Sequence, residues 1–384
     1  MATNIAQTSI TIPEIDVVVD FGLERRIEYV NGVEGLYLRD ISQADCLQRK
    51  GRAGRVKEGL YILASDTLFE DRVTFSVPEI QRLRIESVIL KFLSIGIEIE
   101  DLDLFHQISS EKIAASKRVL ETLGAIKDGK ITEKGRKLVV MPLDVTHSCM
   151  LLEAEKRGVL SDMITVVSIL ESGPLFYKPR KVIPVQNRYS DVLDRFLVFN
   201  MLEKEYFISR NFKSSLFEEI NMKTFFNIIE LRKKLLKFYK DRGVNVKKEA
   251  TKNMNNIILC CLAGAVNNIF VCTGSEYENG KDDEARRLDN KSVVSSGKIV
   301  LAQPRDFEVR GYIIKILSTV SVVTVDMIME VFPNLLSVKR TEPRYNQYDG
   351  KFYVTESYWY NTICLKEIEK EIEVPDSERR VEIA

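Results

Sequence analysis

Short β-branched runs and polar segments alternate along residues 1–72. Residues 15–20, Ile-Asp-Val-Val-Val-Asp, form an apolar run that ends in an acid, and residues 60–63, Leu-Tyr-Ile-Leu, form a second run. Such runs are typical of buried parallel strands. A parallel strand needs neighbours on both sides, and we expect the upstream neighbours to be missing from this sequence. The pattern therefore predicts part of an α/β sheet with an exposed edge.

Apolar residues at helical spacing mark the next segment, residues 73–143, and one such series is Ile85, Val88, Ile89, Phe92 and Leu93. Asp128-Gly129 is a strong turn signal and precedes the short run Lys130-Ile131-Thr132. Helices followed by a small β-turn unit are typical of a winged helix. We therefore expect a winged-helix domain at 73–143.

Residues 144–252 predict a helical bundle. Gly158 is a plausible helix stop, three prolines make 173–188 a loop, and Ser190-Asp191 is placed to cap the helix that follows. Residues 231–252 are the most basic stretch of the chain. Two interpretations of this stretch stay open, a solvated helix face and a surface that contacts an RNA backbone.

The last segment, residues 253–384, has β-rich runs at 268–272, 298–301 and 320–324. Residues 274–290 are polar and rich in turn residues, which predicts an exposed loop. Short strands joined by such loops favour an OB-like barrel with a C-terminal extension. The Glu-rich residues 367–382 predict a solvated terminal helix or a frayed end.

Composition narrows the choice of function. The 384 residues are enough for two to four domains, and 56 Lys+Arg balance 56 Asp+Glu, so any nucleic-acid contact must come from local patches. Six scattered cysteines and two histidines make a zinc site improbable and favour a reducing compartment. No apolar run reaches the length of a membrane helix, so we expect a cytoplasmic protein without a membrane partner.

Residues 48–55, Gln-Arg-Lys-Gly-Arg-Ala-Gly-Arg, carry the clearest chemistry. If the run opens a helix, Arg49, Arg52 and Arg55 stack along one face, and the intervening glycines leave that face open to a ligand. Arginine makes planar, bidentate contacts with phosphoryl oxygens, and Gln48 adds an amide that can orient a water or a terminal phosphate oxygen. The pattern predicts phosphate binding.

The same run resembles motif VI of the DEAH-box RNA helicases, which are ATP-dependent superfamily 2 enzymes with two RecA-like domains. Residues 3–12, Thr-Asn-Ile-Ala-Gln-Thr-Ser-Ile-Thr-Ile, resemble motif V of that family, with Gln7 where the family has Glu. Residues 78–82, 123–126, 131–136 and 141–144 follow in the family's order. The match is clear from residue 3 to about 175 and looser to about 335.

The resemblance implies a multidomain α/β and α fold. Its expected parts are a partial second RecA-like domain with a parallel sheet at 1–72, the winged helix at 73–143, a ratchet-type helical bundle at 144–252 and the OB-like domain with its extension at 253–384. The family binds ATP with Mg²⁺ between its two RecA-like domains. Carried over by position, Arg52 and Arg55 become arginine fingers that stabilise transition-state charge, and Gln48 places the water or γ-phosphate.

Further roles follow from the same resemblance. Arg49 and Asp16 fall among the nucleotide-binding positions, where Arg49 has a structural alternative and Asp16 has the alternative of a strand-end acid. Thr3 and Thr8 match motif V positions that touch the RNA backbone, and Ser190 and Asp191 match the start of a helix beside the RNA channel. The expected partner is single-stranded RNA, which such contacts would position without reading its sequence.

The sequence contains no G-x-x-x-x-G-K-[ST] phosphate loop and no DEAH tetrad. We therefore expect the first RecA-like domain to be absent and the chain alone not to hydrolyse ATP. One hypothesis is that this chain is the C-terminal part of an RNA helicase. It would be active only together with an N-terminal half supplied in trans, with a protein activator as a further expected partner. The alternative is a non-catalytic RNA- or protein-binding module, and a DNA helicase is a third possibility.

Overall fold

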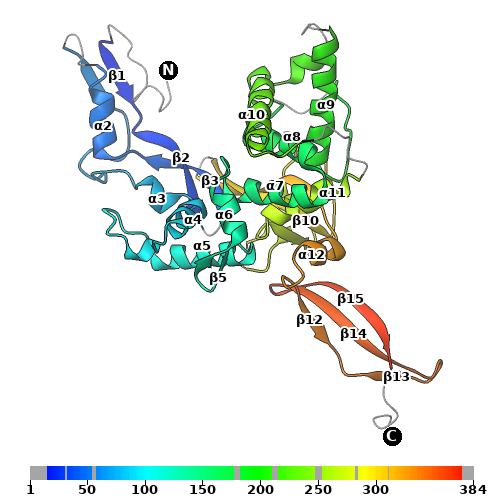
Figure 1. Cartoon of the computed structure of the whole chain (residues 1–384). Coiled ribbons are helices and arrows are strands. Elements are labelled where there is room, and N and C mark those ends of the chain that lie inside the picture. The colour runs from blue at the N-terminus through cyan, green and yellow to red at the C-terminus, as the bar shows by residue number, and fades with distance from the viewer. Residues whose placement is uncertain are drawn as a thin grey trace. The chain divides into compact units, whose positions relative to one another are not determined.

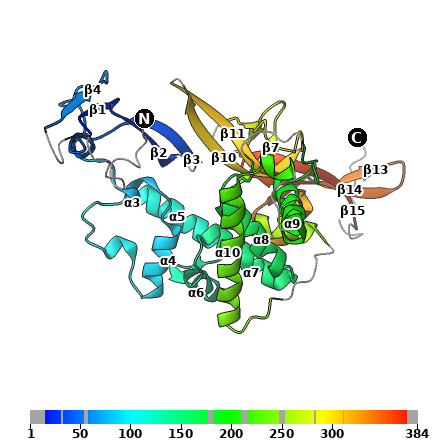
Figure 2. The same cartoon turned by 90° about the horizontal axis from the view of Figure 1, so that it is seen from above.

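The computed structural model describes residues 15–30, 33–53, 58–176, 182–209, 215–246, 253–281, 284–309 and 311–373. The chain divides into two compact units, and Figures 1 and 2 show their helices and strands. Unit 1 comprises Met1–Phe92, Gly96–Lys117 and Pro304–Lys315. Unit 2 comprises Leu93–Ile95, Arg118–Gln303 and Ile316–Ala384.

The first strands of unit 1 form a short parallel sheet. β1 (Val17–Asp20) pairs in parallel with β4 (Leu60–Leu63), so the predicted parallel pairing is confirmed, whereas the predicted burial of these strands is wrong. Val17 faces Leu60 in this register and Val19 faces Ile62, and all four side chains are exposed by 43–55%. One face of this sheet is therefore exposed, in addition to the edge that the sequence predicted to be exposed.

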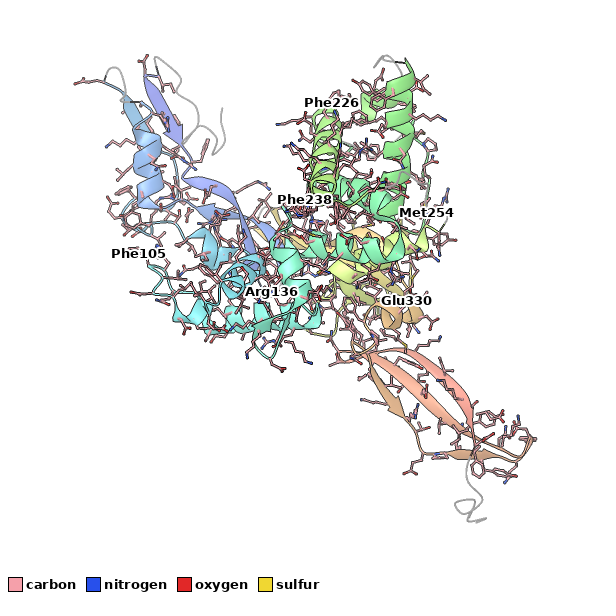
Figure 3. All side chains as sticks on the ribbon, viewed as in Figure 1. Phe105, Arg136, Phe226, Phe238, Met254 and Glu330 are labelled. Atoms are coloured by element: carbon pink, nitrogen blue, oxygen red, sulfur yellow. The ribbon has the colours of Figure 1, made fainter. Side chains whose placement is uncertain are left out.

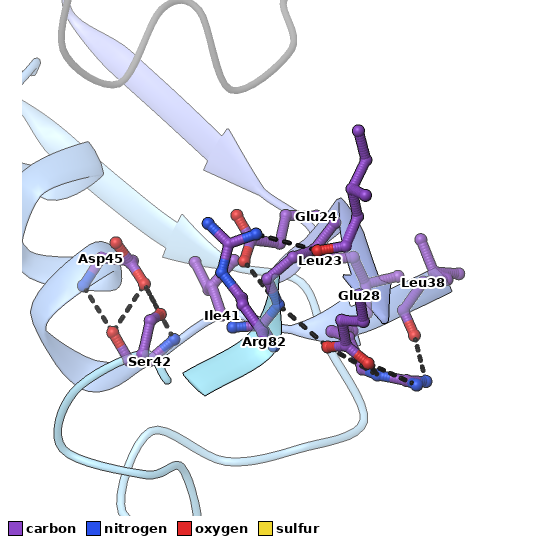
Figure 4. A network of polar contacts seen from close by, with 12 residues as sticks. Leu23, Glu24, Glu28, Leu38, Ile41, Ser42, Asp45 and Arg82 are labelled. Carbon is purple, nitrogen blue, oxygen red and sulfur yellow. Dashed lines mark hydrogen bonds and ion pairs between the residues drawn. The ribbon is translucent and has the colours of Figure 1, made fainter. Parts of the chain in front are cut away.

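A second sheet of unit 1 joins distant parts of the chain. β2 (Leu23–Val30) and β3 (Val33–Asp40) form an antiparallel hairpin, and Arg305, Asp306 and Phe307 of β10 (Ile299–Val309) pair in parallel with β3. Ion pairs connect the three strands on one face. The Arg39 guanidinium lies 2.9 Å from a carboxylate oxygen of Glu28 and 3.4 Å from one of Glu308, and Figure 4 labels Glu28 in the polar network of this region.

The predicted segment of helices and a small β-turn unit is present along the chain. It contains α3 (Glu79–Arg82), α4 (Glu86–Ser94), the 3₁₀ turn η1 (Ile99–Asp101), α5 (Ser110–Thr122), the strands β5 (Ile126–Lys127) and β6 (Lys130–Ile131), and α6 (Glu133–Val139). Asp128 and Gly129 both have positive φ, 50° and 74°, as the tight hairpin turn between β5 and β6 requires. The Asp-Gly turn is confirmed, and a winged-helix domain with the limits 73–143 stays a prediction.

The helices of unit 2 surround a large apolar core. They are α7 (Val145–Arg157), α8 (Leu160–Glu171), α9 (Asp191–Ser209), η2 (Ser215–Glu219), α10 (Met222–Asp241) and α11 (Asn255–Gly264). Met163, Phe199, Phe225 and Ile257 are all fully buried in that core. Gly158 ends α7 at φ 69°, a left-handed conformation in which glycine is least strained, so the predicted helix stop is confirmed.

Helix α11 packs tightly on α7 through Gly264. A Cβ atom at this position would overlap the carbonyl oxygen of Thr146 and come within 2.8 Å of Met150 Cγ. We expect Gly264→Ala to lower the free energy of unfolding of unit 2 by about 1–3 kcal/mol, because the helices cannot separate without losing core contacts. Urea unfolding followed by the fluorescence of Trp359, the single tryptophan, measures the effect, and an unchanged midpoint would contradict the predicted overlap.

Strands predicted in the last segment are present. β7 (Ile269–Cys272) pairs with the start of β10 and with β8 (Tyr277–Glu278), and β11 (Tyr312–Val322) pairs with β9 (Arg287–Leu288). Phe270, Val300 and Val320 form a small core beneath them. A helix, α12 (Val325–Val331), follows. An OB-like barrel and a domain of 253–384 stay predictions.

The C-terminal extension is an antiparallel sheet. β12 (Ser337–Arg340) and β13 (Arg344–Asn346) both pair with β14 (Lys351–Tyr360), which pairs on its other side with β15 (Ile363–Ile372) (Figure 1). The predicted terminal helix is wrong for residues 367–372, since Ile368 and Ile372 alternate with glutamates at strand spacing. Residues 374–384 lie outside the described part. Within the described residues, no helix is long and apolar enough to span a membrane.

Candidate nucleotide site and its relatives

The basic motif lies at the end of a helix. α2 (Gln43–Lys50) begins with a capping box, in which the Ser42 hydroxyl accepts from the Asp45 N–H and the Asp45 carboxylate accepts from the Ser42 N–H. The helix stops at Gly51, whose N–H donates to the Leu47 carbonyl over 3.0 Å. The run therefore ends a helix and does not open one, because glycine at the cap disfavours further helix, and the condition for stacking its arginines along one helix face is not met.

The Arg49 side chain contacts β1 and the start of β2 in unit 1. Its Nη1 donates to Asp20 Oδ1 over 2.8 Å and to the Leu23 carbonyl over 3.2 Å. Asp20, at the end of β1, also accepts from the Tyr61 hydroxyl over 2.9 Å and from the Gly22 N–H over 3.0 Å. The side chains of Arg49 and Asp20 are 15% and 4% exposed, so this is a buried, hydrogen-bonded ion pair that fixes α2 to the parallel sheet.

The groups around this ion pair stay uncharged at neutral pH. Burial and the hydrogen bond to Asp20 raise the pKa of Tyr61 above its ordinary value, so the phenol remains a proton donor. Burial also raises the pKa of the Cys46 thiol on the inner side of α2. The anchor of α2 therefore consists of one ion pair supported by a neutral phenol and thiol.

The remaining nucleotide-site candidates are divided between two regions. Gln48 is exposed near the end of α2, and Arg52 is half-buried in the turn that follows it. Asp16 is exposed one residue before β1, and its carbonyl accepts from the Leu60 N–H over 2.7 Å. The structure brings Gln48 and Arg52 to the same end of α2, and Asp16 lies just before the start of β1. Arg55, Thr3 and Thr8 lie outside the described residues.

Comparison with known proteins places this geometry in context. Residues 1–57 match the family model for the helicase conserved C-terminal domain. The ATP-dependent RNA helicase HrpA of Escherichia coli (strain K12) is 39% identical over 180 residues, which are 44% of this chain and 14% of HrpA. The ATP-dependent RNA helicase DHX33 of Drosophila melanogaster is 37% identical over 185 residues, covering 46% of this chain and 26% of DHX33.

The chain is a homologue of DEAH-type RNA helicases, with a helicase C-terminal domain at its N-terminus. A solved structure of the Escherichia coli DEAH/RHA helicase HrpB matches 98% of this chain with a TM-score of 0.68 and 21% identity, which shows a shared mixed α/β fold. This helicase homologue spans 42% of that HrpB chain and between 14% and 26% of the curated relatives named above.

In this helicase homologue, Ser190 and Asp191 are buried. The Ser190 hydroxyl caps α9 by accepting from the Leu193 N–H over 3.1 Å, and it lies 2.7 Å from the Ser321 hydroxyl. The Asp191 carboxylate accepts from the Ser292 hydroxyl and from the Val293 and Val320 N–H groups. These bonds join α9 to the strands of unit 2, and RNA contact by Ser190 and Asp191 stays a prediction only.

Sequence reasoning missed Asp20 and Tyr61 as site residues. A signal was present, because Asp20 ends an apolar strand and is followed by Gly22, the arrangement of an acid at the carboxyl end of a parallel strand. Tyr61 carries no such signal. Its role depends on the register that places β4 beside β1, with Asp20 opposite Leu63, and a single sequence does not reveal that register.

One group in the described residues has the donor types of a metal site. Asp144, His147 and Glu171 bring ligand atoms within 4.8 Å of one another. His147 Nδ1 lies 3.1 Å from Asp144 Oδ2 and 2.8 Å from Glu171 Oε1, so the imidazole bridges the start of α7 and the end of α8. Burial lowers the pKa of His147, but the two carboxylates outweigh it and raise the pKa to about 9. These contacts fit an imidazolium held between two acids.

The His147 bridge predicts a pH-dependent stability. Because its pKa is raised from 6.5 to about 9 in the folded protein, the stabilisation is complete below pH 6.5 and is lost as the pH rises through 9. We expect His147→Gln to remove about 1–3 kcal/mol at pH 6 and much less at pH 10. Thermal unfolding of both proteins between pH 6 and 10 checks this. An equal destabilisation at both pH values would show that the charge of His147 contributes nothing.

Proposed function

We propose that this chain is the C-terminal part of an ATP-dependent RNA helicase, coupling NTP hydrolysis to movement along single-stranded RNA. It would supply the arginine side of the nucleotide site and an RNA-binding surface. The observation that carries the proposal is the anchored α2, in which the buried Arg49–Asp20 pair fixes the helix whose end bears Gln48 and Arg52. A helix fixed in this way presents charge in a defined position without reorganisation.

The residue types at the end of α2 suit phosphate. The Arg52 guanidinium would bind β- and γ-phosphate oxygens and stabilise charge that develops during transfer, and Gln48 would orient the attacking water. Arg55 would act as a second finger. In this proposal ATP, bound with Mg²⁺, is the substrate whose γ-phosphoryl group is transferred. Arginine and glutamine amide groups are poor Mg²⁺ sites, so carboxylate ligands and the phosphate loop belong to a different part of the enzyme in this proposal.

RNA contact is the second half of the proposal. The curated relatives HrpA and DHX33 are named ATP-dependent RNA helicases, which supports RNA as the substrate class. Thr3 and Thr8 would donate to phosphates and sugars and so hold a strand without sequence preference. We place the protein in the cytoplasm, with the N-terminal helicase half and a protein activator as partners.

Complementation tests this proposal. The chain is mixed with a separately expressed polypeptide that carries the phosphate loop and the DEAH tetrad, and ATP hydrolysis is measured with and without single-stranded RNA. We expect RNA-stimulated hydrolysis from the mixture and none from either component. Hydrolysis by this chain alone would overturn the assignment of the phosphate loop to another polypeptide.

A non-catalytic RNA- or protein-binding module is the second candidate. The observation that favours it is the lack of a G-x-x-x-x-G-K-[ST] motif in the sequence. RNA binding with no hydrolysis under any complementation would support the module and reject the helicase part. Binding of single- and double-stranded DNA, compared with RNA of the same sequence, separates a DNA helicase from both, because a preference for 2′-hydroxyls is not visible in sequence.

A further inference from the structure

Helix α10 of unit 2 has a buried face and a basic exposed face. Thr224, Phe225, Ile228, Ile229, Leu235 and Tyr239 are buried against the bundle. The exposed positions include Phe226, Lys233, Lys237 and Lys240, which recur at helical spacing along one side. At about 1.5 Å per residue, the stripe from Phe226 to Lys240 is about 21 Å long.

The basic residues of α10 differ in what they contact. Arg232 makes its contacts within the bundle. It pairs with Glu203, and its guanidinium carbon lies 5.6 Å from the centre of the Phe199 ring. By contrast, Lys233, Lys237 and Lys240 form no ion pair within the described part of the chain. Residues 231–240 contain no acid, although the chain as a whole has no net charge. The local positive charge is therefore available to a polyanion.

An aromatic residue lies at one end of the lysine stripe. Phe226 is 39% exposed, and its ring packs edge-on against Phe225 and Tyr206, with centroid distances of 5.6 and 5.9 Å. Figure 3 labels Phe226 and Phe238 at opposite ends of α10. Phe238 is covered by the Arg242 guanidinium, whose carbon lies 3.6 Å from the ring centre. Phe226 thus has an exposed part on a ring whose position neighbouring aromatics fix.

We propose that this exposed face of α10 binds the backbone of single-stranded RNA, with Lys233, Lys237 and Lys240 at phosphates and Phe226 under a base. A row of cations beside a fixed aromatic ring is how proteins hold single strands without reading sequence. The inference rests on the proposed function, because it assigns part of the RNA-binding surface of the helicase. It develops, for the α10 part of residues 231–252, the interpretation in which this stretch contacts an RNA backbone.

Two nearby acids weaken the attraction of α10 for phosphate, and the helix dipole gives another reason for lysines at its C-terminus. Glu230 and Asp241 are exposed at either side of the lysines and reduce the attraction for phosphate. Lysines near a helix C-terminus also compensate the helix dipole without any ligand. Dipole compensation does not require an exposed aromatic ring at the opposite end of the stripe, and RNA binding accounts for both features.

The test is RNA binding by the full chain, measured as fluorescence anisotropy of a labelled 20-nucleotide oligouridine over a range of salt. The variant K233Q/K237Q/K240Q removes the stripe. K137Q/K156Q/K351Q removes the same charge from exposed lysines that pair with acids elsewhere. We expect the first variant to lower the log–log salt slope by about 2, at about 0.7 per phosphate contact, and to weaken binding at least tenfold. The control variant should keep the slope.

Phe226→Leu tests the stacking contact while keeping an apolar side chain against Tyr206 and Phe225. We expect weaker binding with an unchanged salt slope, since no cation is removed. If the unaltered chain binds RNA and the stripe variant binds with the same slope, the inference is wrong and the proposed function stands. If the unaltered chain does not bind RNA, both fail. Binding of polyglutamate in place of RNA, lost in the stripe variant, would assign the face to an acidic protein and overturn the inference.

Discussion

Arg52→Ala is expected to reduce RNA-stimulated ATP hydrolysis of the complemented chain by about 10³–10⁵-fold. The guanidinium at the end of α2 would stabilise charge on the transferred phosphoryl group, and alanine leaves that charge without its partner. Steady-state kinetics should show the loss mainly in kcat, because an interaction made in the transition state contributes little to ground-state binding.

The matched control for Arg52 is Lys50→Ala. Lys50 is an exposed cation two residues earlier, at the last position of α2, so the variant removes the same charge from the same end of the helix. We expect its kcat to stay within a few-fold of the unaltered chain. Equal losses in both variants would mean that general positive charge, and not a positioned arginine, supports the reaction.

Asp20→Ala is expected to release α2 from the sheet. The substitution leaves the buried Arg49 guanidinium, the Tyr61 hydroxyl and the Gly22 N–H without their acceptor. Removing one partner of a buried ion pair costs about 3–5 kcal/mol. Because hydrogen exchange reports local opening, the exchange of the α2 amides is the suitable measurement, and we expect their protection to fall by the corresponding factor.

Two further variants separate the components of the Asp20 anchor. Asp16→Ala removes an exposed acid four residues earlier and should change α2 protection by no more than about 0.5 kcal/mol. Tyr61→Phe deletes one hydrogen bond and should cost about 1 kcal/mol. Full protection of α2 in Asp20→Ala would show that the ion pair does not hold the helix.

Local sequence patterns predicted the elements that depend on neighbouring residues. The apolar runs gave β1 and β4, Asp128-Gly129 gave the hairpin turn, and Gly158 gave the end of α7. Each signal acts within a few residues, through strand alternation, positive φ or helix capping. Such local physics does not depend on how distant segments meet.

The missed features depend on contacts between distant segments. Arg49 was predicted either as a nucleotide-binding residue or as a structural one, and its bond to Asp20, 29 residues earlier, is a contact that local spacing does not reveal. The bonds of Asp191 to Ser292 and Val320 span more than 100 residues and have no local sequence signal, while its RNA contact stays a prediction. The Glu-rich residues from 367 onward predicted a solvated terminal helix or a frayed end, whereas pairing with β14 makes residues 367–372 part of a strand.

The most direct test measures ATP hydrolysis by this chain alone, with and without single-stranded RNA, alongside RNA binding by the same preparation. The account predicts salt-sensitive RNA binding and no hydrolysis above background. Hydrolysis that persists in Arg52→Ala after contaminating ATPases are excluded would contradict it, since the chain would then hold a nucleotide site that does not depend on the end of α2.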